Sequence, residues 1–425
     1  MSYTLASINP GSDISFTETF DFSEIGDGSD PDRVIDDRLA QLLAITACVS
    51  YYKLAAPPRI VVDFPVAPFE VEYLRQVIEG GLGEFAYVND LPAALTPVIE
   101  VRSERAPAER VIDSWNGTAQ PLVAVGGGKD SVVTIEALKS GGWTPVLFSV
   151  NRYQPIDDCI AVSGLGSIHV RRRIDAAMTD LNKAGAYNGH IPVTAINSCV
   201  ALVAADLLGL GSVIMSNEQS ADIENLVWHG FNVNHQWSKS IVYEDLLRAT
   251  LAGYGFDSNR YFSLLRALPE SEIANRFSEC VEYFDVFVSC NRSFALDPSR
   301  RRSRWCGECP KCLFVFVILA PRIPKERLVG IFAANLLDTS ANLDLYRELA
   351  GLEKHKPFEC VGDYSEVAEA FVDLLDSADW ASDSVVAALA AERTSLETIA
   401  ARRTSIIGSG NVPDEFAGVF NALLP

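Results

Sequence analysis

Residues 121–139, PLVAVGGGKDSVVTIEALK, place the polar segment Lys129–Ser131 directly after a run of three glycines: Gly126, Gly127 and Gly128. Residues 122–125 are rich in β-branched types, as in a buried parallel strand, and residues 132–138 have helical apolar spacing. Glycines have no Cβ, so the turn between these elements can approach an anion closely. Because the first amides and the dipole of a helix attract negative charge, this stretch predicts a phosphate-binding turn.

The hexapeptide GGGKDS at residues 126–131 has neither the Walker spacing nor the pattern G-x-G-x-x-G. It resembles the PP-loop of the N-type ATP pyrophosphatases, Ser-Gly-Gly-x-Asp-Ser, whose members cleave ATP to AMP and pyrophosphate. Gly126 replaces the first serine, so one hydroxyl contact to phosphate is missing. The resemblance implies that the amides of residues 127–131 and the Ser131 hydroxyl hold pyrophosphate, with Asp130 near Mg²⁺ and Lys129 as a charge partner. The alternative is an ordinary strand-to-helix turn.

Four cysteines have the spacing of a metal site: Cys290, Cys306, Cys309 and Cys312. The motif WCGECPKC places three of them as C-x2-C-x2-C around Gly307, and Cys290 supplies a fourth thiolate from a preceding strand end. Four thiolates make a closed tetrahedral Zn²⁺ site, structural rather than catalytic because no position remains for water. An iron–sulfur cluster is the rival, since it also uses four thiolates. The same spacing is similar to that of the 7-cyano-7-deazaguanine synthases, another PP-loop family.

Two polar segments supply candidates for proton transfer. Residues 227–244, VWHGFNVNHQWSKSIVYE, contain His229, His235 and Lys239 without a repeating period, which predicts a loop that lines a substrate site. Imidazole exchanges protons near neutral pH, although a single histidine is more often structural. Cys360 lies in HKPFECVGDYSE, between an acidic residue and a turn, and is either a buried thiol or a proton-transferring one.

These groups need a scaffold, and the sequence predicts an α/β sheet. Residues 144–151 form a second candidate strand at a distance that suits a right-handed crossover. Residues 191–196 read as a strand, residues 197–208 as a helix that ends at Gly209, and residues 212–216 as another buried strand. Ligands bind at the carboxyl ends of such strands, where we expect nucleotide or metal contacts from Ser149, Asn151, Asn217 and Glu218. A buried strand and helix capping are the alternatives.

Composition limits the class of protein. A chain of 425 residues with 48% hydrophobic residues is long enough for two or three globular domains. Its formal net charge of −21 repels nucleic acid and anionic membranes. The amino terminus has no signal-peptide pattern, no apolar run reaches the ~20 residues that span a bilayer, and nine cysteines fit a reducing compartment, so we expect a cytoplasmic protein.

We expect three regions. Residues 1–118 form a mixed α+β N-terminal domain, and residues 324–425 form a mainly helical C-terminal region with amphipathic runs. Between them, residues 119–323 form a PP-loop domain, in which helices cover both faces of a parallel sheet and the four cysteines bind metal. The sequence leaves the oligomeric state open.

An ordered set of motifs between about residues 120 and 366 resembles the UDP-N-acetylmuramoyl-L-alanyl-L-glutamate epimerase family. The set consists of the glycine turn, NGHIPVTAINS, SNEQSAD, VNHQWSKS, WCGECPKC and HKPFECVG. The resemblance implies an ATP- and Mg²⁺-dependent enzyme of peptidoglycan precursor synthesis. Such an enzyme inverts the terminal L-glutamate of a UDP-muramoyl dipeptide and releases AMP and pyrophosphate.

This reaction agrees with the chemistry of the motifs. A carboxylate hinders removal of the neighbouring C–H proton because a second negative charge would develop on the same fragment, and adenylation cancels the first. The candidate bases are His229, His235, Lys239 and Cys360. A PP-loop ligase or an amide- or nitrile-forming enzyme would trap the adenylate with ammonia instead. A tRNA-modifying PP-loop enzyme, which the acidity disfavours, and a nucleotide-binding regulator without catalysis remain as competing interpretations.

Overall fold

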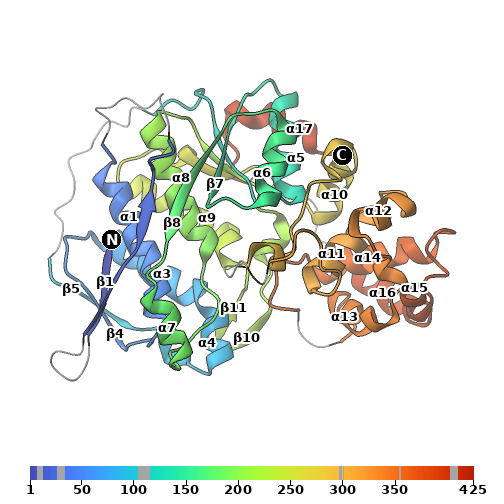
Figure 1. Cartoon of the computed structure of the whole chain (residues 1–425), viewed down its shortest axis with the longest axis horizontal. Helices are drawn as coiled ribbons and strands as arrows, with labels where there is room; N and C mark the ends of the chain where they lie inside the picture. The colour runs from blue at the N-terminus through green and yellow to red at the C-terminus, as the bar shows by residue number, and fades with distance from the viewer. Residues whose placement is uncertain are drawn as a thin grey trace.

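A computed structural model of the chain describes residues 1–6, 13–25, 34–103, 115–295, 299, 301–353, 356–402 and 410–425. His355, which opens one of the polar segments above, lies outside these ranges. The described residues form an α/β body that is extended at one side by a helical lobe (Figure 1).

A six-stranded sheet in the order β12-β9-β6-β7-β8-β3 forms the centre of the molecule. Its strands are β3 (Thr19–Asp21), β6 (Leu122–Ala124), β7 (Val146–Val150), β8 (Ser167–Arg173), β9 (Val213–Met215) and β12 (Tyr261–Ser263). Only β3 runs antiparallel to its neighbour. The chain passes from β6 to β7 and β8 on one side, then returns to β9 and β12 on the other. The carboxyl ends of β6 and β9 therefore meet at a topological switch point, where α/β proteins bind ligands.

Successive residues of these strands face two different hydrophobic cores, as the two-residue period of a strand requires. Leu122 and Val213 lie in one core with α1 (Asp37–Ala47), α8 (Val193–Leu208) and α9 (Ile241–Gly253). Val123 and Ile214 lie in the other with α5 (Lys129–Ser140), α6 (Gln154–Ser163) and α10 (Glu270–Ser278). The predicted parallel strands and the helices on both faces are confirmed.

The strand predicted at residues 191–196 is wrong, because α8 begins at Val193 and continues through this segment. Its β-branched residues favoured a strand, but Ala195 and Ile196 are buried on the helix. Pro192 precedes the first turn, where a helix does not use the missing N–H. The expected end at Gly209 is confirmed, with φ +64°.

The N-terminal region joins the same sheet. It contains β1 (Ser2–Leu5), β2 (Ile14–Thr17), α2 (Val49–Tyr52), β4 (Arg59–Val62), α3 (Pro68–Gly81), α4 (Gly83–Asn89) and β5 (Val98–Val101). β3 pairs with β8, and next to it Arg172 Nε donates to buried Glu18 Oε1 at 2.5 Å. Buried residues of α1 and α3 share a core with α8. The domain boundary at residue 118 stays a prediction.

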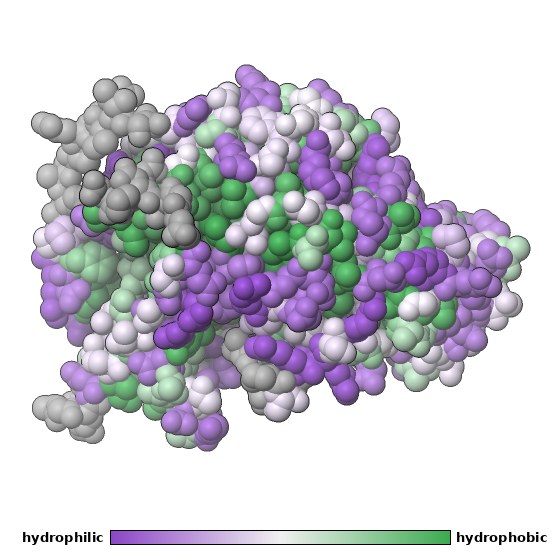
Figure 2. Space-filling view, turned by 45° about the horizontal axis from the view of Figure 1, so that its top comes forward, coloured by the Kyte–Doolittle hydropathy of each residue, from purple (hydrophilic) through white to green (hydrophobic). Residues whose placement is uncertain are grey.

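The C-terminal region is mainly helical, as the amphipathic runs predicted. α11 (Pro310–Leu319), α12 (Lys325–Phe332), α13 (Leu343–Leu349), α14 (Tyr364–Leu375), α15 (Ser384–Leu389) and α16 (Arg393–Ala400) form the lobe at the right of Figure 1. α17 (Ala417–Leu423) returns to pack on α5. Figure 2 shows hydrophilic and hydrophobic side chains interspersed over one face of the body and the lobe. Among the described residues, no helix is both long and apolar enough to span a bilayer.

Candidate active site

The glycine turn connects β6 to α5 at the switch point. Gly127 has φ +76°, and a Cβ added there would lie 3.1 Å from the carbonyl carbon and oxygen of Pro155. A Cβ at Gly128 would lie 3.1 Å from the Cβ of Ser289, whereas one at Gly126 would meet nothing within 4 Å. Within the described part of the chain, the backbone N–H groups of residues 127–131 have no hydrogen-bond partner. This arrangement fits an anion held by main-chain amides.

Substitution of Gly127 by alanine is expected to lower the free energy of unfolding by about 1–3 kcal/mol, because alanine is strained at this φ and its methyl group would press on Pro155. Chemical denaturation measures the change. Gly126→Ala is the matched control and is expected to change stability by less than about 0.5 kcal/mol. Equal stability of the two variants would contradict the geometry of the turn.

Lys129 is engaged within the protein. Its side chain is 2% exposed and forms ion pairs with Asp130 and with Glu270, which is equally buried. Burial opposes its charge, but these two carboxylates raise the pKa of Lys129 above its usual range. Burial alone would raise the pKa of Asp130, but the charges of Lys129 and Lys311 outweigh burial and lower the pKa below its usual value. Asp130 is therefore a carboxylate. Lys129 is therefore a charge partner of the turn itself.

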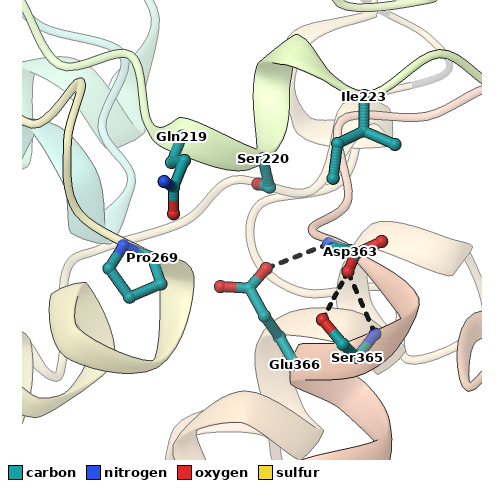
Figure 3. Close-up of a pocket in the computed structure, with 7 residues that line it drawn as sticks. All are labelled: Gln219, Ser220, Ile223, Pro269, Asp363, Ser365 and Glu366. Carbon is teal, nitrogen blue, oxygen red and sulfur yellow. Dashed lines mark hydrogen bonds between the residues drawn. The ribbon is translucent and has the colours of Figure 1, made fainter. Parts of the chain in front are cut away.

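The C-terminal lobe reaches this network through Glu366 on α14. Figure 3 shows Glu366 extending from α14 toward Pro269 and Gln219 across a small pocket, with Asp363 at the start of the helix. The Asp363 N–H donates to Glu366 Oε2 at 2.9 Å, and the Glu270 N–H donates to Glu366 Oε1 at 2.5 Å. Burial and the charge of Glu270 raise the pKa of Glu366 to about 8. α14 is thus connected to the glycine turn through Glu270 and Lys129.

Asn217 and Glu218 lie directly after β9 and are buried. Asn217 Nδ2 donates to Ser263 Oγ at 3.1 Å, and the charge of Glu218 raises the pKa values of Lys239 and Glu270. Ser149 and Asn151, at the end of β7, have partners within the protein. Ser149 Oγ lies 2.8 Å from His169 Nδ1, and Asn151 Oδ1 accepts from the Arg172 N–H at 2.9 Å.

Three of the four candidate bases come together. Cys360, His235 and Lys239 lie within electrostatic range of one another, and each changes the pKa of the thiol or is changed by it. Burial opposes ionisation of Cys360, but Lys239, His235 and Lys311 lower its pKa to about 6. Burial lowers the pKa of His235, but Cys360 and Glu84 raise it to about 9. At neutral pH the pair is therefore a thiolate and an imidazolium, a state in which cysteine is a strong base or nucleophile.

Hydrogen bonds from side-chain amides to main-chain carbonyl groups hold these residues in place. The segment that carries Cys360 lies against the segment that carries His235, because Asn225 Nδ2 donates to the Pro357 carbonyl at 2.9 Å and Gln236 Nε2 donates to the Val361 carbonyl at 3.0 Å. Lys239 closes a 3-10 helix, η3 (Trp237–Lys239), directly before α9. The chain between residues 225 and 240 thus presents two cations to one thiolate.

Glu84 and His190 complete the surroundings of His235, and sequence reasoning did not select either as a site residue. Glu84 Oε2 lies 2.5 Å from His235 Nδ1 and 3.9 Å from His190 Nδ1, and the two imidazole rings are 4.3 Å apart. Burial and the charge of His235 lower the pKa of His190 to about 3, so His190 is neutral. If Glu84 and His235 bound one tetrahedral metal ion, their ligand atoms would lie about 3.3 Å apart. The short Glu84–His235 contact is therefore a hydrogen bond that orients the imidazolium.

His229 lies elsewhere, at the exposed tip of a hairpin between β10 (Leu226–Trp228) and β11 (Phe231–Val233). His229 and Gly230 both have positive φ, at +49° and +85°, as in a type I′ turn. The segment predicted as a loop thus contains a hairpin, η3 and the start of α9. The structure does not bring His229 to the other candidate bases.

The four cysteines form a second cluster. Their sulfur atoms lie within 4.8 Å of one another, with 3.6 Å between Cys306 and Cys312 and 3.4 Å between Cys309 and Cys312. Gly307 has φ +72°, which allows the chain to turn between Cys306 and Cys309. A tetrahedral Zn²⁺ with Zn–S bonds of about 2.3 Å holds its sulfurs about 3.8 Å apart. The donor set therefore fits a single ion.

Comparisons with known proteins cover most of the chain. Residues 1–264 match the MurL N-terminal domain, and residues 286–404 match the MurL C-terminal domain. Proteins of a Micromonospora species and of Salinispora tropica are each 47% identical over 352 residues, and both are named UDP-N-acetyl-alpha-D-muramoyl-L-alanyl-L-glutamate epimerase. These matches cover 83% of this chain and 78% and 76% of the relatives.

A protein of Xanthomonas oryzae pv. oryzae with the same name is 40% identical over 347 residues, which cover 81% of this chain and 76% of the relative. No solved structure matches. The two domains in order, together with identity of this extent, show that the chain belongs to the MurL family of epimerases.

Proposed function

We propose that this protein inverts the terminal L-glutamate of UDP-N-acetylmuramoyl-L-alanyl-L-glutamate through an acyl-adenylate, with release of AMP and pyrophosphate. The names of the relatives support the substrate. One observation supports the adenylate: Lys239 lies within electrostatic range of both Cys360 and Asp130 in the glycine turn, and both raise its pKa. A group that binds phosphate and a group that accepts a proton therefore belong to one site.

In the first step the glutamate α-carboxylate attacks the α-phosphorus of ATP, the bond to the β-phosphate oxygen breaks, and pyrophosphate leaves with that electron pair. The free amides of residues 127–131 are placed to bind the departing anion. Asp130 and Glu218 supply the carboxylate oxygens that Mg²⁺ prefers and would hold it there, where it would neutralise phosphate charge.

In the second step the Cys360 thiolate removes the α-proton of the adenylate. The adenylated carboxyl group takes up the electron pair, and a protonated neighbour, His235 or Lys239, returns a proton to the opposite face. Water then releases AMP. Cys360 and Glu84 raise the pKa of His235, and Cys360, Glu218 and Asp130 raise that of Lys239, so both groups can stabilise the thiolate and donate a proton.

Incubation with ATP, Mg²⁺ and the UDP-muramoyl dipeptide tests this function. The proposal predicts dipeptide-dependent formation of AMP and, by chiral analysis of the hydrolysed product, the appearance of D-glutamate. AMP formation that requires ammonium, with glutamate left in the L form, would favour a ligase instead.

The proposed chemistry predicts a bell-shaped pH dependence of kcat/KM. Activity rises as Cys360 loses its proton near pH 6 and falls as His235 loses its proton near pH 9. The groups that face this pair are Lys239, Lys311, Lys356, Glu84 and His190, together with Glu359, whose pKa burial raises to about 6.

Glu359→Gln separates the two groups that titrate near pH 6. The acid limb of the profile is expected to persist in this variant, because the Cys360 thiolate remains. Loss of the acid limb in Glu359→Gln would assign that limb to Glu359 and contradict the role of Cys360.

We propose that the four cysteines bind one structural Zn²⁺. The four thiolates of an iron–sulfur cluster are shared among two or four irons and span more than the 4.8 Å within which all four sulfurs lie here. Metal analysis of the purified chain is expected to give about one zinc per chain. Cys306→Ser is expected to lose it and to unfold at a lower temperature, whereas Cys280→Ser should keep it. Iron with the visible absorption of a cluster would contradict this assignment.

A further inference from the structure

Lys311 is a buried lysine whose ammonium group has no ion-pair or hydrogen-bond partner in the described part of the chain. It lies in the first turn of α11, between the ligand candidates Cys309 and Cys312, and is 7% exposed. Among the described residues its ammonium forms no hydrogen bond or ion pair, and its one specific contact is with the Phe314 ring, whose centroid lies 5.3 Å from Nζ. Buried charges are normally paired because desolvation is costly. No carboxylate among the described residues lies within ion-pair distance of Nζ, so the arrangement fits an anionic ligand in direct contact with Lys311.

Of the three other buried lysines of the described chain, Lys356 has its pKa lowered by burial, and two show the usual pairing. Lys53 Nζ donates to Asn188 Oδ1 at 2.9 Å and to the Gly189 carbonyl at 3.0 Å, and Lys129 is paired with two carboxylates. The charge of Lys129 is therefore balanced within the protein, although Lys129 belongs to the glycine turn. The charge of Lys311 has no such ion-pair partner among the described residues and can act on a ligand.

The position of Lys311 indicates the ligand. Its charge acts on Asp130 in the glycine turn and on Cys360, so it lies within electrostatic range of both halves of the proposed site. The four-cysteine cluster is also joined directly to the turn. The Val288 N–H donates to the Gly127 carbonyl at 2.8 Å, and Ser289 packs on Gly128 immediately before Cys290. The cluster thereby connects the start of α11, which carries Lys311, to the glycine turn.

We propose that Lys311 binds a phosphate group of the nucleotide and that the four-cysteine site holds it in position. This inference rests on the proposed function. The ligand class is a phosphate ester or anhydride, with two sources: the AMP half, which carries the acyl phosphate of the adenylate, or pyrophosphate. A lysine acts as a point charge on such groups and needs no particular ligand geometry.

Calorimetric titration of Lys311→Met with AMP and, separately, with pyrophosphate, each with Mg²⁺, tests the inference. Affinity for at least one of them is expected to fall about tenfold or more, while zinc content stays unchanged. Lys183→Met, an exposed control, should bind as the unaltered protein does. A fall for AMP alone assigns Lys311 to the acyl phosphate, and a fall for pyrophosphate alone assigns it to the leaving group.

Unchanged affinity for both ligands in a zinc-loaded Lys311→Met variant would overturn this inference alone. Failure of the unaltered protein to bind either ligand would instead overturn the proposed function. If the variant loses zinc, reductive methylation of the unaltered protein decides. AMP or pyrophosphate should protect Lys311 and leave Lys183 reactive, and the absence of protection at Lys311 would overturn the inference.

Discussion

Replacement of Cys360 by alanine is expected to lower the rate of glutamate inversion by about a thousandfold, while ATP–pyrophosphate exchange in the presence of the dipeptide continues. Lys239 and His235 lower the pKa of the thiol, which makes it the proposed base of the second step only. The glycine turn, which acts in the first step, keeps its geometry. Separate assays of exchange and of D-glutamate measure the two steps.

Cys48→Ala is the matched control for this experiment. Cys48 is a half-buried thiol beside Glu18, and its pKa is raised to about 12 by burial and by that carboxylate, so it stays protonated. Its replacement should leave both assays unchanged. Inversion at the full rate in Cys360→Ala would remove Cys360 from the mechanism and leave His235 and Lys239 as the candidate bases.

The second large effect is expected at the glycine turn. Asp130→Asn removes a half-buried carboxylate that pairs with Lys129 in the first turn of α5 and that would hold Mg²⁺ in the proposed site. Both ATP–pyrophosphate exchange and inversion are expected to fall by about a hundredfold or more, and by the same factor, because the first step limits both. This common fall distinguishes Asp130 from Cys360.

Asp180→Asn is the control for Asp130→Asn, because Asp180 is 81% exposed and its contact with Lys183 is 3.5 Å long. Surface pairs of this kind contribute little to stability or function. A fall in inversion without a fall in exchange in Asp130→Asn would show that Asp130 does not act in adenylation.

The parts of the site that depend on local spacing were predictable from the sequence. The glycine turn follows from a β-branched run, three glycines and a helical pattern within 19 residues, and the four-cysteine cluster follows from C-x2-C-x2-C. In both cases the chain order alone brings the groups together. The strand at residues 191–196 was predicted wrongly because β-branched residues also begin a buried helix, and only the tertiary packing of α8 decides.

The groups that depend on long-range pairing were missed. Glu84 and His235 are 151 residues apart in sequence, and Lys129 and Glu270 are 141 apart. No local pattern around Glu84 or Glu270 indicates a partner. Lys311 is different, because a lysine between two ligand cysteines is visible in WCGECPKC, but its burial without a partner appears only in the folded chain.

The central claim is that the α-carbon of glutamate loses its proton while its carboxyl group is attached to AMP. Turnover of the UDP-muramoyl dipeptide with ATP and Mg²⁺ in deuterated water tests this most directly. Mass spectrometry of the recovered D-glutamate is expected to show one deuterium at the α-carbon, and without ATP neither label nor inversion should appear. D-Glutamate formed without label, or labelled in the absence of ATP, would contradict the mechanism.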